Sequence, residues 1–109
     1  MTTRPFRVWL TVQVVPGKES GFEQAWVTGH ELITAQEANL GHWLYRSSTE
    51  EQTYYVVSDW RDETSFRAFE SSPAHLAHRK ELYPFRSGGA MAVMTELNGA
   101  AARTSGAAR

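Results

Sequence analysis

The stretch TYYVVSDW, residues Thr53–Trp60, decides the fold because it is apolar on both sides of an extended chain. Side chains along a strand alternate between opposite faces. The apolar residues therefore divide into two sets, with Tyr54, Val56 and Trp60 on one face and Tyr55 and Val57 on the other. An antiparallel sheet that faces water usually carries polar residues on that side. The pattern predicts a strand in a sheet that is covered on both faces.

Three more strands are predicted around this one from β-branched and aromatic composition and from the turn residues that flank each run. They cover residues 6–15, 42–47 and 90–97. The first repeats the two-sided pattern, with Leu10, Val12 and Val14 opposite Trp9 and Val15. A polar turn at residues 49–52 joins the second to Thr53–Trp60, so we expect these two strands to pair antiparallel. Gly88-Gly89 is expected to precede the last strand.

Two helical regions are predicted from residues that recur with the period of an α-helix. The first is expected from Lys18 to about Ala38-Asn39, and its stripe consists of Phe22, Ala25, Trp26, Gly29, His30 and Ile33. Asp62 is expected to cap the second region, whose apolar side is supplied by Phe66 and Phe69. Ser72-Pro73 interrupts that region. Because Pro is tolerated in a first helical turn, a further helix is expected over residues 73–83.

The order of these elements, βαββαβ, predicts an α+β ferredoxin-like domain, a four-stranded antiparallel sheet with helices on one face. This domain is expected to occupy residues 1–97, and residues 98–109, which lack periodicity, are expected to form a disordered C-terminal tail. The helices leave the second sheet face to be covered by another layer. A twofold homodimer, in which a second copy supplies that layer, is the simplest prediction.

Composition limits the partners and the compartment. The chain has 109 residues and a net charge of −1, without the basic excess of a nucleic-acid-binding domain. It contains no Cys, which removes thiolate chemistry and fits a reducing compartment. No signal-peptide pattern is present, and no apolar stretch approaches the about 20 residues of a membrane span. We therefore expect a cytoplasmic protein that binds neither nucleic acid nor membrane.

Residues 56–79, VVSDWRDETSFRAFESSPAHLAHR, resemble the central signature of the antibiotic biosynthesis monooxygenase family of dimeric α/β barrels. In that family a Trp ends the third strand, an aromatic residue follows six positions later, and a Ser-Pro break precedes a short helix that carries His or Arg. The matching residues here are Trp60, Phe66, Ser72-Pro73 and the stretch His75 to Arg79. Pro16-Gly17-Lys18 and Leu40-Gly41 also agree, so the resemblance covers roughly residues 7–97.

The resemblance implies a cofactor-independent oxygenase that oxidises a phenolic or anthrone-like ring of a small aromatic polyketide with molecular oxygen. A polyketide cyclase of the same fold and a non-catalytic dimeric accessory or binding protein are the alternatives. The quinone-forming members resemble one another in an Asn four residues before the strand-ending Trp, where this chain has Val56, and that difference favours the cyclase. Leu10 and Phe69 stand where heme-degrading members carry Asn and Trp, which disfavours heme degradation.

No cofactor is expected. The chain has neither a G-x-G-x-x-G nor a phosphate-loop pattern, so a bound nucleotide is disfavoured. Free flavin supplied by a partner protein stays open. His75-x-x-His78 has no third ligand at a telling spacing, so no metal site is expected.

Trp60 and the last helix supply the first candidates for catalysis. Trp60 is expected where the third strand meets the helices, and its indole N–H can donate to a substrate oxygen. His75, His78 and Arg79 recur on one helix face. His78 is the expected base for a phenol or a 1,3-diketone, and Arg79 is expected to hold the resulting enolate. A core Trp and a solvated helix face are the structural alternatives.

His30 is a further candidate for catalysis, because a polar ring on an apolar helix stripe must find a partner or line a cavity. A core histidine with a satisfied hydrogen bond is its structural alternative. The residues expected to bind the substrate are Trp26, His75, Phe66, Phe69, Tyr83 and Arg86. Of these, Tyr83 and Arg86 are expected in a loop before the last strand, either at the pocket mouth or simply on the surface.

Overall fold

The computed structural model describes residues 5–100, so residues 1–4 and 101–109 lie outside the description. The elements are β1 (Phe6–Val14), α1 (Glu19–Thr34), β2 (Asn39–Arg46), β3 (Thr53–Trp60), α2 (Glu63–Glu70), α3 (Pro73–Leu82), the 3₁₀ turn η1 (Tyr83–Phe85) and β4 (Arg86–Thr95). The predicted ferredoxin-like arrangement is confirmed. Most of the predicted tail falls outside the described residues, and residues 98–100 belong to no helix or strand.

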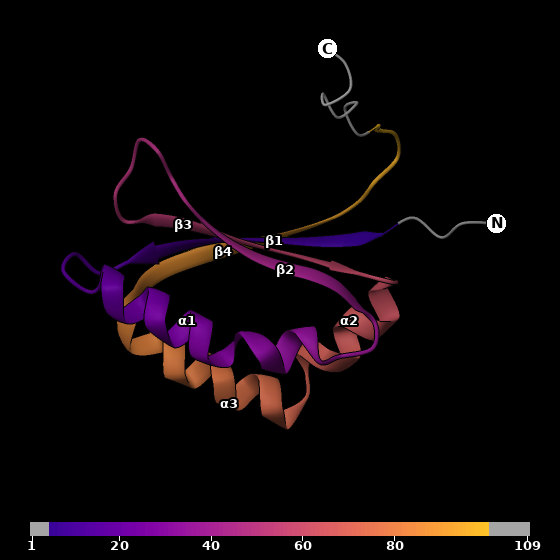
Figure 1. Ribbon diagram of the computed structural model, residues 1–109, viewed down its shortest axis with the longest axis horizontal. Helices are drawn as coiled ribbons and strands as arrows, with labels where there is room; N and C mark the ends of the chain where they lie inside the picture. The colour runs from indigo at the N-terminus through magenta and orange to yellow at the C-terminus, as the bar shows by residue number, and fades with distance from the viewer. Residues whose placement is uncertain (1–4, 101–109) are drawn as a thin grey trace, which may run out of the picture.

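The four strands form one antiparallel sheet in the order β2-β3-β1-β4. The helices lie on one side of this sheet (Figure 1). In the register of the two central strands, Val8 is opposite Ser58, while on the other side of β1 Leu10 is opposite Met91 of β4. This register lines up side chains from three strands beneath the helices.

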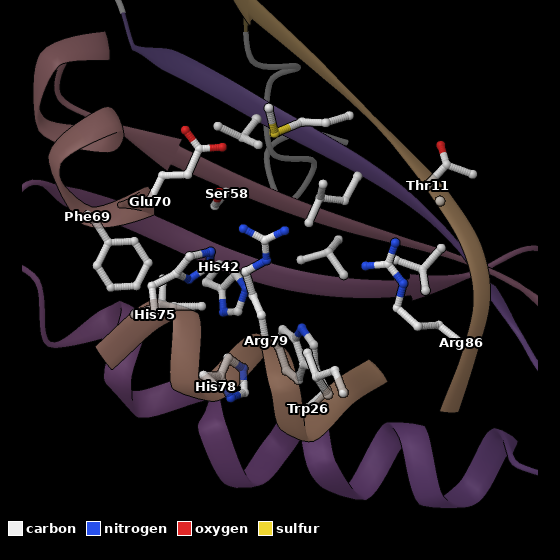
Figure 2. Close-up of a pocket in the computed structure, with 18 of the residues that line it drawn as sticks. Thr11, Trp26, His42, Ser58, Phe69, Glu70, His75, His78, Arg79 and Arg86 are labelled. Carbon is white, nitrogen blue, oxygen red and sulfur yellow. The ribbon is translucent and has the colours of Figure 1, made fainter. Parts of the chain in front are cut away.

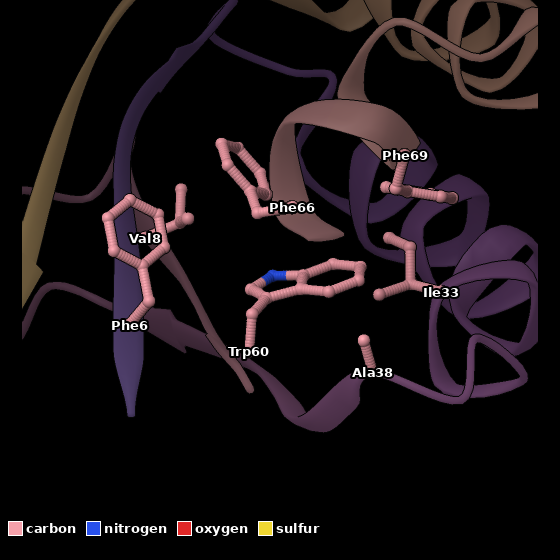
Figure 3. Close-up of a cluster of buried hydrophobic side chains, with 7 residues drawn as sticks. All are labelled: Phe6, Val8, Ile33, Ala38, Trp60, Phe66 and Phe69. Carbon is pink, nitrogen blue, oxygen red and sulfur yellow. The ribbon is translucent and has the colours of Figure 1, made fainter. Parts of the chain in front are cut away.

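Two clusters of buried side chains join the helices to the sheet. The first surrounds Trp60 (Figure 3) and contains Phe6, Val8, Ile33, Ala38, Phe66 and Phe69. The second contains Val12, Val14, Phe22, Trp26, Tyr54 and Val56. Trp60 is 1% exposed, stacks on Phe69 at 5.2 Å between ring centroids, and donates its indole N–H to the Ser58 hydroxyl at 3.0 Å.

The predicted start signals of α2 and α3 are confirmed. The Asp62 carboxylate accepts a hydrogen bond from the Ser65 backbone N–H at 2.8 Å, which satisfies one of the free donors of the first turn of α2. Ser72 caps α3 by accepting from the His75 N–H at 3.2 Å, and Pro73 occupies the first turn of that helix. The chain therefore forms two helices here, as predicted. The second of them, α3, is in contact with α1.

Two predicted boundaries around β2 are wrong. The first helix ends at Thr34 instead of near Ala38-Asn39, and the second strand begins at Asn39 instead of His42. The Asn39 side chain donates to the carbonyls of Gly41 and Asp59 at 3.1 and 3.2 Å. These bonds tie the chain to β3 across an irregular register between Asn39 and Gly41. Asn39, which was predicted to end the helix, therefore begins a strand that has a bulge at its first residues.

The predicted start of the last strand is also wrong, because β4 begins at Arg86 and includes both glycines. Gly89 pairs with Val12, and a side chain there would meet the Thr11 carbonyl and the Arg86 guanidinium. The glycines permit a close approach of backbone and side chain instead of ending the strand. The predicted end of the first strand is one residue too late, since β1 ends at Val14.

The sheet face opposite the helices is apolar, as predicted, and no element of residues 5–100 covers it (Figure 1). Trp9, Tyr55 and Val57 lie on it, and β2 adds Trp43 and Tyr45. Val57 is only 4% exposed because Trp9 and Trp43 stand beside it in the neighbouring strands. Val15, expected on this face, lies past the end of β1, where its N–H donates to the Phe85 carbonyl at 2.9 Å.

Replacing Trp60 with Ala should lower the free energy of unfolding by about 3–5 kcal/mol, because the substitution leaves a cavity in the first cluster. It also removes the donor to the buried Ser58 hydroxyl. Urea unfolding measures the loss. The matched control is Val27→Ala on α1, a position that is 60% exposed, which should change stability by no more than about 0.5 kcal/mol. Equal effects of the two substitutions would contradict a supporting role for the indole.

Candidate active site

A cavity of about 320 Å³ lies between the sheet and the helices (Figure 2), in the size range of small-molecule sites. Residues of both hydrophobic clusters line it, so it occupies the space where the clusters meet. The floor is formed by β-strand residues that include Val8, Leu10, Val12 and Val56, and Met91 closes the β4 side. Most of the lining is apolar, and the polar side chains come from α2, α3 and all four strands.

Aromatic rings form much of the wall. Trp60, Phe66 and Phe69 stand at one end, and Trp26 of α1 stands at the other. The Trp26 indole N–H is buried and has no hydrogen-bond partner among the described residues. Since buried donors are nearly always paired, this N–H is available to an oxygen atom of a molecule bound in the cavity. A flat aromatic ligand fits these walls through stacking.

His42 of β2 is one of two buried histidines of the cavity wall, with His78, and was not predicted. Its ring stacks on Trp26, with centroids 4.6 Å apart, and its Nδ1 lies 3.0 Å from Nδ1 of His30. Burial, and then the proximity of His30 and His78, lower the pKa of His42 from 6.5 to about 3. The imidazole is therefore neutral at physiological pH and can accept a proton.

His75 and His78 of α3 also line the cavity. The His75 ring contacts Phe69 at 4.8 Å, and its buried Nδ1 has no partner among the described residues. The His78 ring lies against Gly29 so closely that any side chain on that residue would overlap it. Burial lowers the pKa of both imidazoles, and the Arg79 charge adds to the effect on His75. Both rings are therefore neutral bases beside the substrate space.

Arg79 and Arg86 bring positive charge to the cavity, and Figure 2 shows both guanidinium groups pointing into it. Within residues 5–100, no carboxylate forms an ion pair with either one. Glu70 also lines the cavity, but its carboxylate accepts from Arg67 at 3.0 Å. The two guanidinium groups are thus free to hold an oxyanion, such as an enolate or a phenolate.

The structure brings most of the predicted site residues together. The cavity is lined by Trp26, Trp60, Phe66, Phe69, His75, His78, Arg79 and Arg86. His30 does not line it, but its ring contacts His42, which does. Tyr83 does not line it either. That residue belongs to η1, is exposed, and carries the Arg86 guanidinium over its ring at 5.6 Å. Arg86 lies in β4, which corrects the loop predicted for it.

Sequence reasoning missed His42 because the residue read as the first position of a strand, without a partner nearby in sequence. The signal that could have found it is the hairpin register, which places His42 opposite Ser58. Ser58 shares its face of β3 with Val56 and Trp60, the face predicted to point toward the helices. Counting back across the turn from Trp60 would have placed the imidazole on that inner face.

Neither a cluster of metal-ligating side chains nor a helix that could span a membrane is found in the part of the chain that the structure describes. Among residues 5–100, no group of three or more His, Cys, Asp and Glu side chains is placed to hold a metal ion. No helix within the same range has the length and apolar character needed to cross a membrane.

Stability should depend on pH through His42. In the unfolded chain this imidazole takes up a proton near its ordinary pKa of 6.5, whereas in the folded protein it stays neutral down to about 3. The contribution of His42 to the free energy of unfolding is therefore fully present above pH 6.5. It is lost as the pH falls toward 3, by up to about 1.4 kcal/mol per pH unit. His42→Gln should make the dependence shallower, as urea unfolding between about pH 7.5 and about pH 5 measures. Parallel curves for the two proteins would contradict a neutral buried His42.

Comparison with known proteins agrees with this geometry. Residues 5–81 match the family model of the antibiotic biosynthesis monooxygenases. No protein with curated function matches the chain in sequence. SnoaB, a cofactor-independent oxygenase from Streptomyces nogalater, has a similar structure, with a TM-score of 0.79 and 19% identity over 88% of this chain and 96% of that one.

Two further solved structures are similar to a comparable degree. A candidate antibiotic biosynthesis monooxygenase from Caulobacter crescentus has a TM-score of 0.80 and 20% identity, over 88% of this chain and 92% of its own. PA3566 from Pseudomonas aeruginosa has a TM-score of 0.77 and 14% identity, over 90% of this chain and 99% of its own. Identities this low show a shared fold and nothing about the reaction. The match of the family model over most of the chain shows that this protein belongs to the antibiotic biosynthesis monooxygenase family.

Proposed function

We propose that this protein is a cofactor-independent oxygenase that converts a phenolic or anthrone-like ring of an aromatic polyketide to a quinone with molecular oxygen. The observation that carries the proposal is a cavity with aromatic walls in which neutral imidazoles and unpaired guanidinium groups face the same space. Family membership and the structural likeness to a cofactor-independent oxygenase support it.

The chemistry needs a base and a cation. An imidazole of the cavity removes a proton from the substrate, and Arg79 stabilises the enolate that forms. The electron-rich carbon of that enolate reacts with molecular oxygen to give a hydroperoxide. Loss of water then leaves a carbonyl group, so that one oxygen atom enters the product and the other leaves as water. Each atom and electron comes from the substrate and from oxygen, and the sequence of steps requires no external reductant.

Val56 favours a second candidate function. This side chain lines the cavity at the position where the quinone-forming members resemble one another in an Asn, and it has no polar group to offer oxygen or an intermediate. A cyclase that closes a ring by an aldol reaction needs the same base and the same cation without oxygen. Oxygen consumption separates the two reactions, and a protein that binds such compounds without converting them would show neither.

Wild-type protein should accelerate oxygen consumption with the anthrone dithranol and yield the corresponding quinone. Arg79→Met should lower kcat/KM by about 10²-fold, because the enolate loses a charged partner in a shielded cavity. Its matched control is Lys80→Met on the same helix. Lys80 is exposed and does not line the cavity, so kcat/KM should stay within about threefold. Consumption no faster than spontaneous oxidation of dithranol would contradict the oxygenase, and ring closure of a diketone analogue would then identify the cyclase.

We also propose that the protein forms a homodimer in which the open sheet faces meet. The face carries Trp9, Trp43 and Tyr45 as exposed rings, and exposed apolar side chains that adjoin one another are typical of interaction surfaces. Arg7 and Asp59 lie on the same face and form an ion pair, with nitrogen and oxygen 2.7 Å apart, so that their opposite charges balance each other. A twofold arrangement lets one patch cover its own copy.

Light scattering should report twice the chain mass for wild-type protein, and Val57→Lys should shift the mass toward one chain or unfold the protein. The reason is that an unpaired charge buried at a position only 4% exposed costs several kcal/mol. Val27→Lys on the exposed side of α1 is the matched control and should leave the mass unchanged. A wild-type mass of one chain at micromolar concentration would refute the homodimer.

A further inference from the structure

His30 and His42 form a hydrogen-bonded pair that leads from the cavity into α1. Their Nδ1 atoms are 3.0 Å apart, the ring planes differ by 12°, and the ring centroids are separated by 5.1 Å. That combination describes two imidazoles that meet edge to edge in nearly one plane. Trp26 packs against both rings, at 4.8 Å from His30 and 4.6 Å from His42 between centroids. The indole therefore holds the two rings in alignment.

The contact between the two Nδ1 atoms restricts the protons of the pair. A neutral imidazole carries one N–H, and a hydrogen bond between two nitrogens requires that one of them donates and the other accepts. If His42 donates from Nδ1, its Nε2 has a lone pair. If His30 donates instead, Nε2 of His42 carries the proton. Because Nδ1 is engaged with His30, Nε2 is the atom of His42 that stays without a partner among the described residues.

We propose that His42 is the general base of this cavity and that His30 receives the proton that His42 releases, so that the pair relays one proton from a bound carbon or hydroxyl acid toward α1. This inference rests on the proposed function and names its base. In the relay, Nε2 of His42 takes the substrate proton while its Nδ1 proton passes to Nδ1 of His30. The electron pair of the broken bond stays on the substrate as an enolate or phenolate. His30 then loses its Nε2 proton to water. The starting tautomers return when Nε2 of His42 gives its proton to the departing product or to water, the shared proton moves back to Nδ1 of His42, and Nε2 of His30 takes a proton from water.

The surroundings of His42 explain why a relay is needed. His30 and Trp26 of α1 contact its ring, His78 of α3 lies close enough to lower its pKa further, and Arg79 lines the same cavity. A positive charge that stayed on His42 would be buried and close to other basic groups, which agrees with the lowering of its pKa to about 3. His30 is only partly buried, so a proton that moves there lies nearer to water.

The other imidazoles of the cavity lack such a path within residues 5–100. His75 has a buried Nδ1 without a partner, and no hydrogen bond leads from the ring of His78, which lies on Gly29. A proton accepted by either ring would stay in the cavity beside Arg79. The pair therefore fits the role of base better than His78, which the sequence had favoured. His78 is placed to lower the basicity of His42 and to shape the cavity wall.

The relay can be tested with nitrobenzisoxazole, whose ring opens to a nitrophenolate after loss of one carbon-bound proton and without oxygen. Wild-type protein should accelerate this opening, and His42→Gln should lower kcat at least about 10²-fold. His30→Ala should lower kcat about tenfold, and added imidazole should restore most of the loss by filling the space of the missing ring. The control variant Glu31→Gln, next to His30 on the exposed side of α1, should keep the wild-type rate.

Melting curves recorded for each variant separate loss of the base from loss of the fold. Nitrogen NMR of the wild-type protein tests the pair without any substitution, and it should show one shared proton between the two Nδ1 atoms. Activity of His42→Gln within about threefold of wild type, a larger loss in His78→Gln, or two unshared Nδ1 atoms would each overturn the relay. The dithranol assay judges the oxygenase separately, because the ring opening uses no oxygen.

Discussion

Burial of the Trp60 indole sets the distance between the sheet and the helices. The ring ends β3, stacks on Phe69, and contacts Phe66 at 5.7 Å between centroids, so α2 is held against the sheet (Figure 3). Phe22 of α1 meets Tyr54 of β3 at 5.1 Å and does the same at the opposite end. These two sets of aromatic contacts hold the helices away from the sheet at both ends. The side chains between them are smaller and do not fill the space that remains. The cavity is thus a consequence of where the large rings stand.

The same geometry controls the charges. Histidines that face a dry space are kept neutral, because a buried cation loses its hydration. Arg79 and Arg86, whose side chains are only partly buried, bring guanidinium groups into the same cavity. Bases that are ready to accept a proton therefore stand beside cations that are ready to hold the anion. This separation is what a reaction that begins with deprotonation of an acidic carbon or hydroxyl requires.

The fold followed from local patterns, and the site only partly. The two-sided strand at Thr53–Trp60, the Asp62 cap and the Ser72-Pro73 break are each encoded by neighbouring residues, which is why they were predictable. His42 depends on pairing between strands, and its partner His30 comes from a helix twelve residues earlier in the chain. Glycines such as Gly89 indicate a break when read locally, whereas the contact that explains them lies across the sheet.

The central strands connect the two faces of the sheet. In β3, Val56 and Ser58 line the cavity while Val57 between them points to the open face. A second copy on that face would restrain the backbone that carries the cavity residues, although Trp9, Tyr55 and Val57 of the open face do not line the cavity. Dimer formation would then affect the shape of the cavity through β3 alone. Side chains alternate between the two faces of a strand, so a shift of Val57 also moves Val56 and Ser58 on the cavity side. Strand β3 is apolar on both faces because one face lines the cavity and the other places Val57 between Trp9 and Trp43.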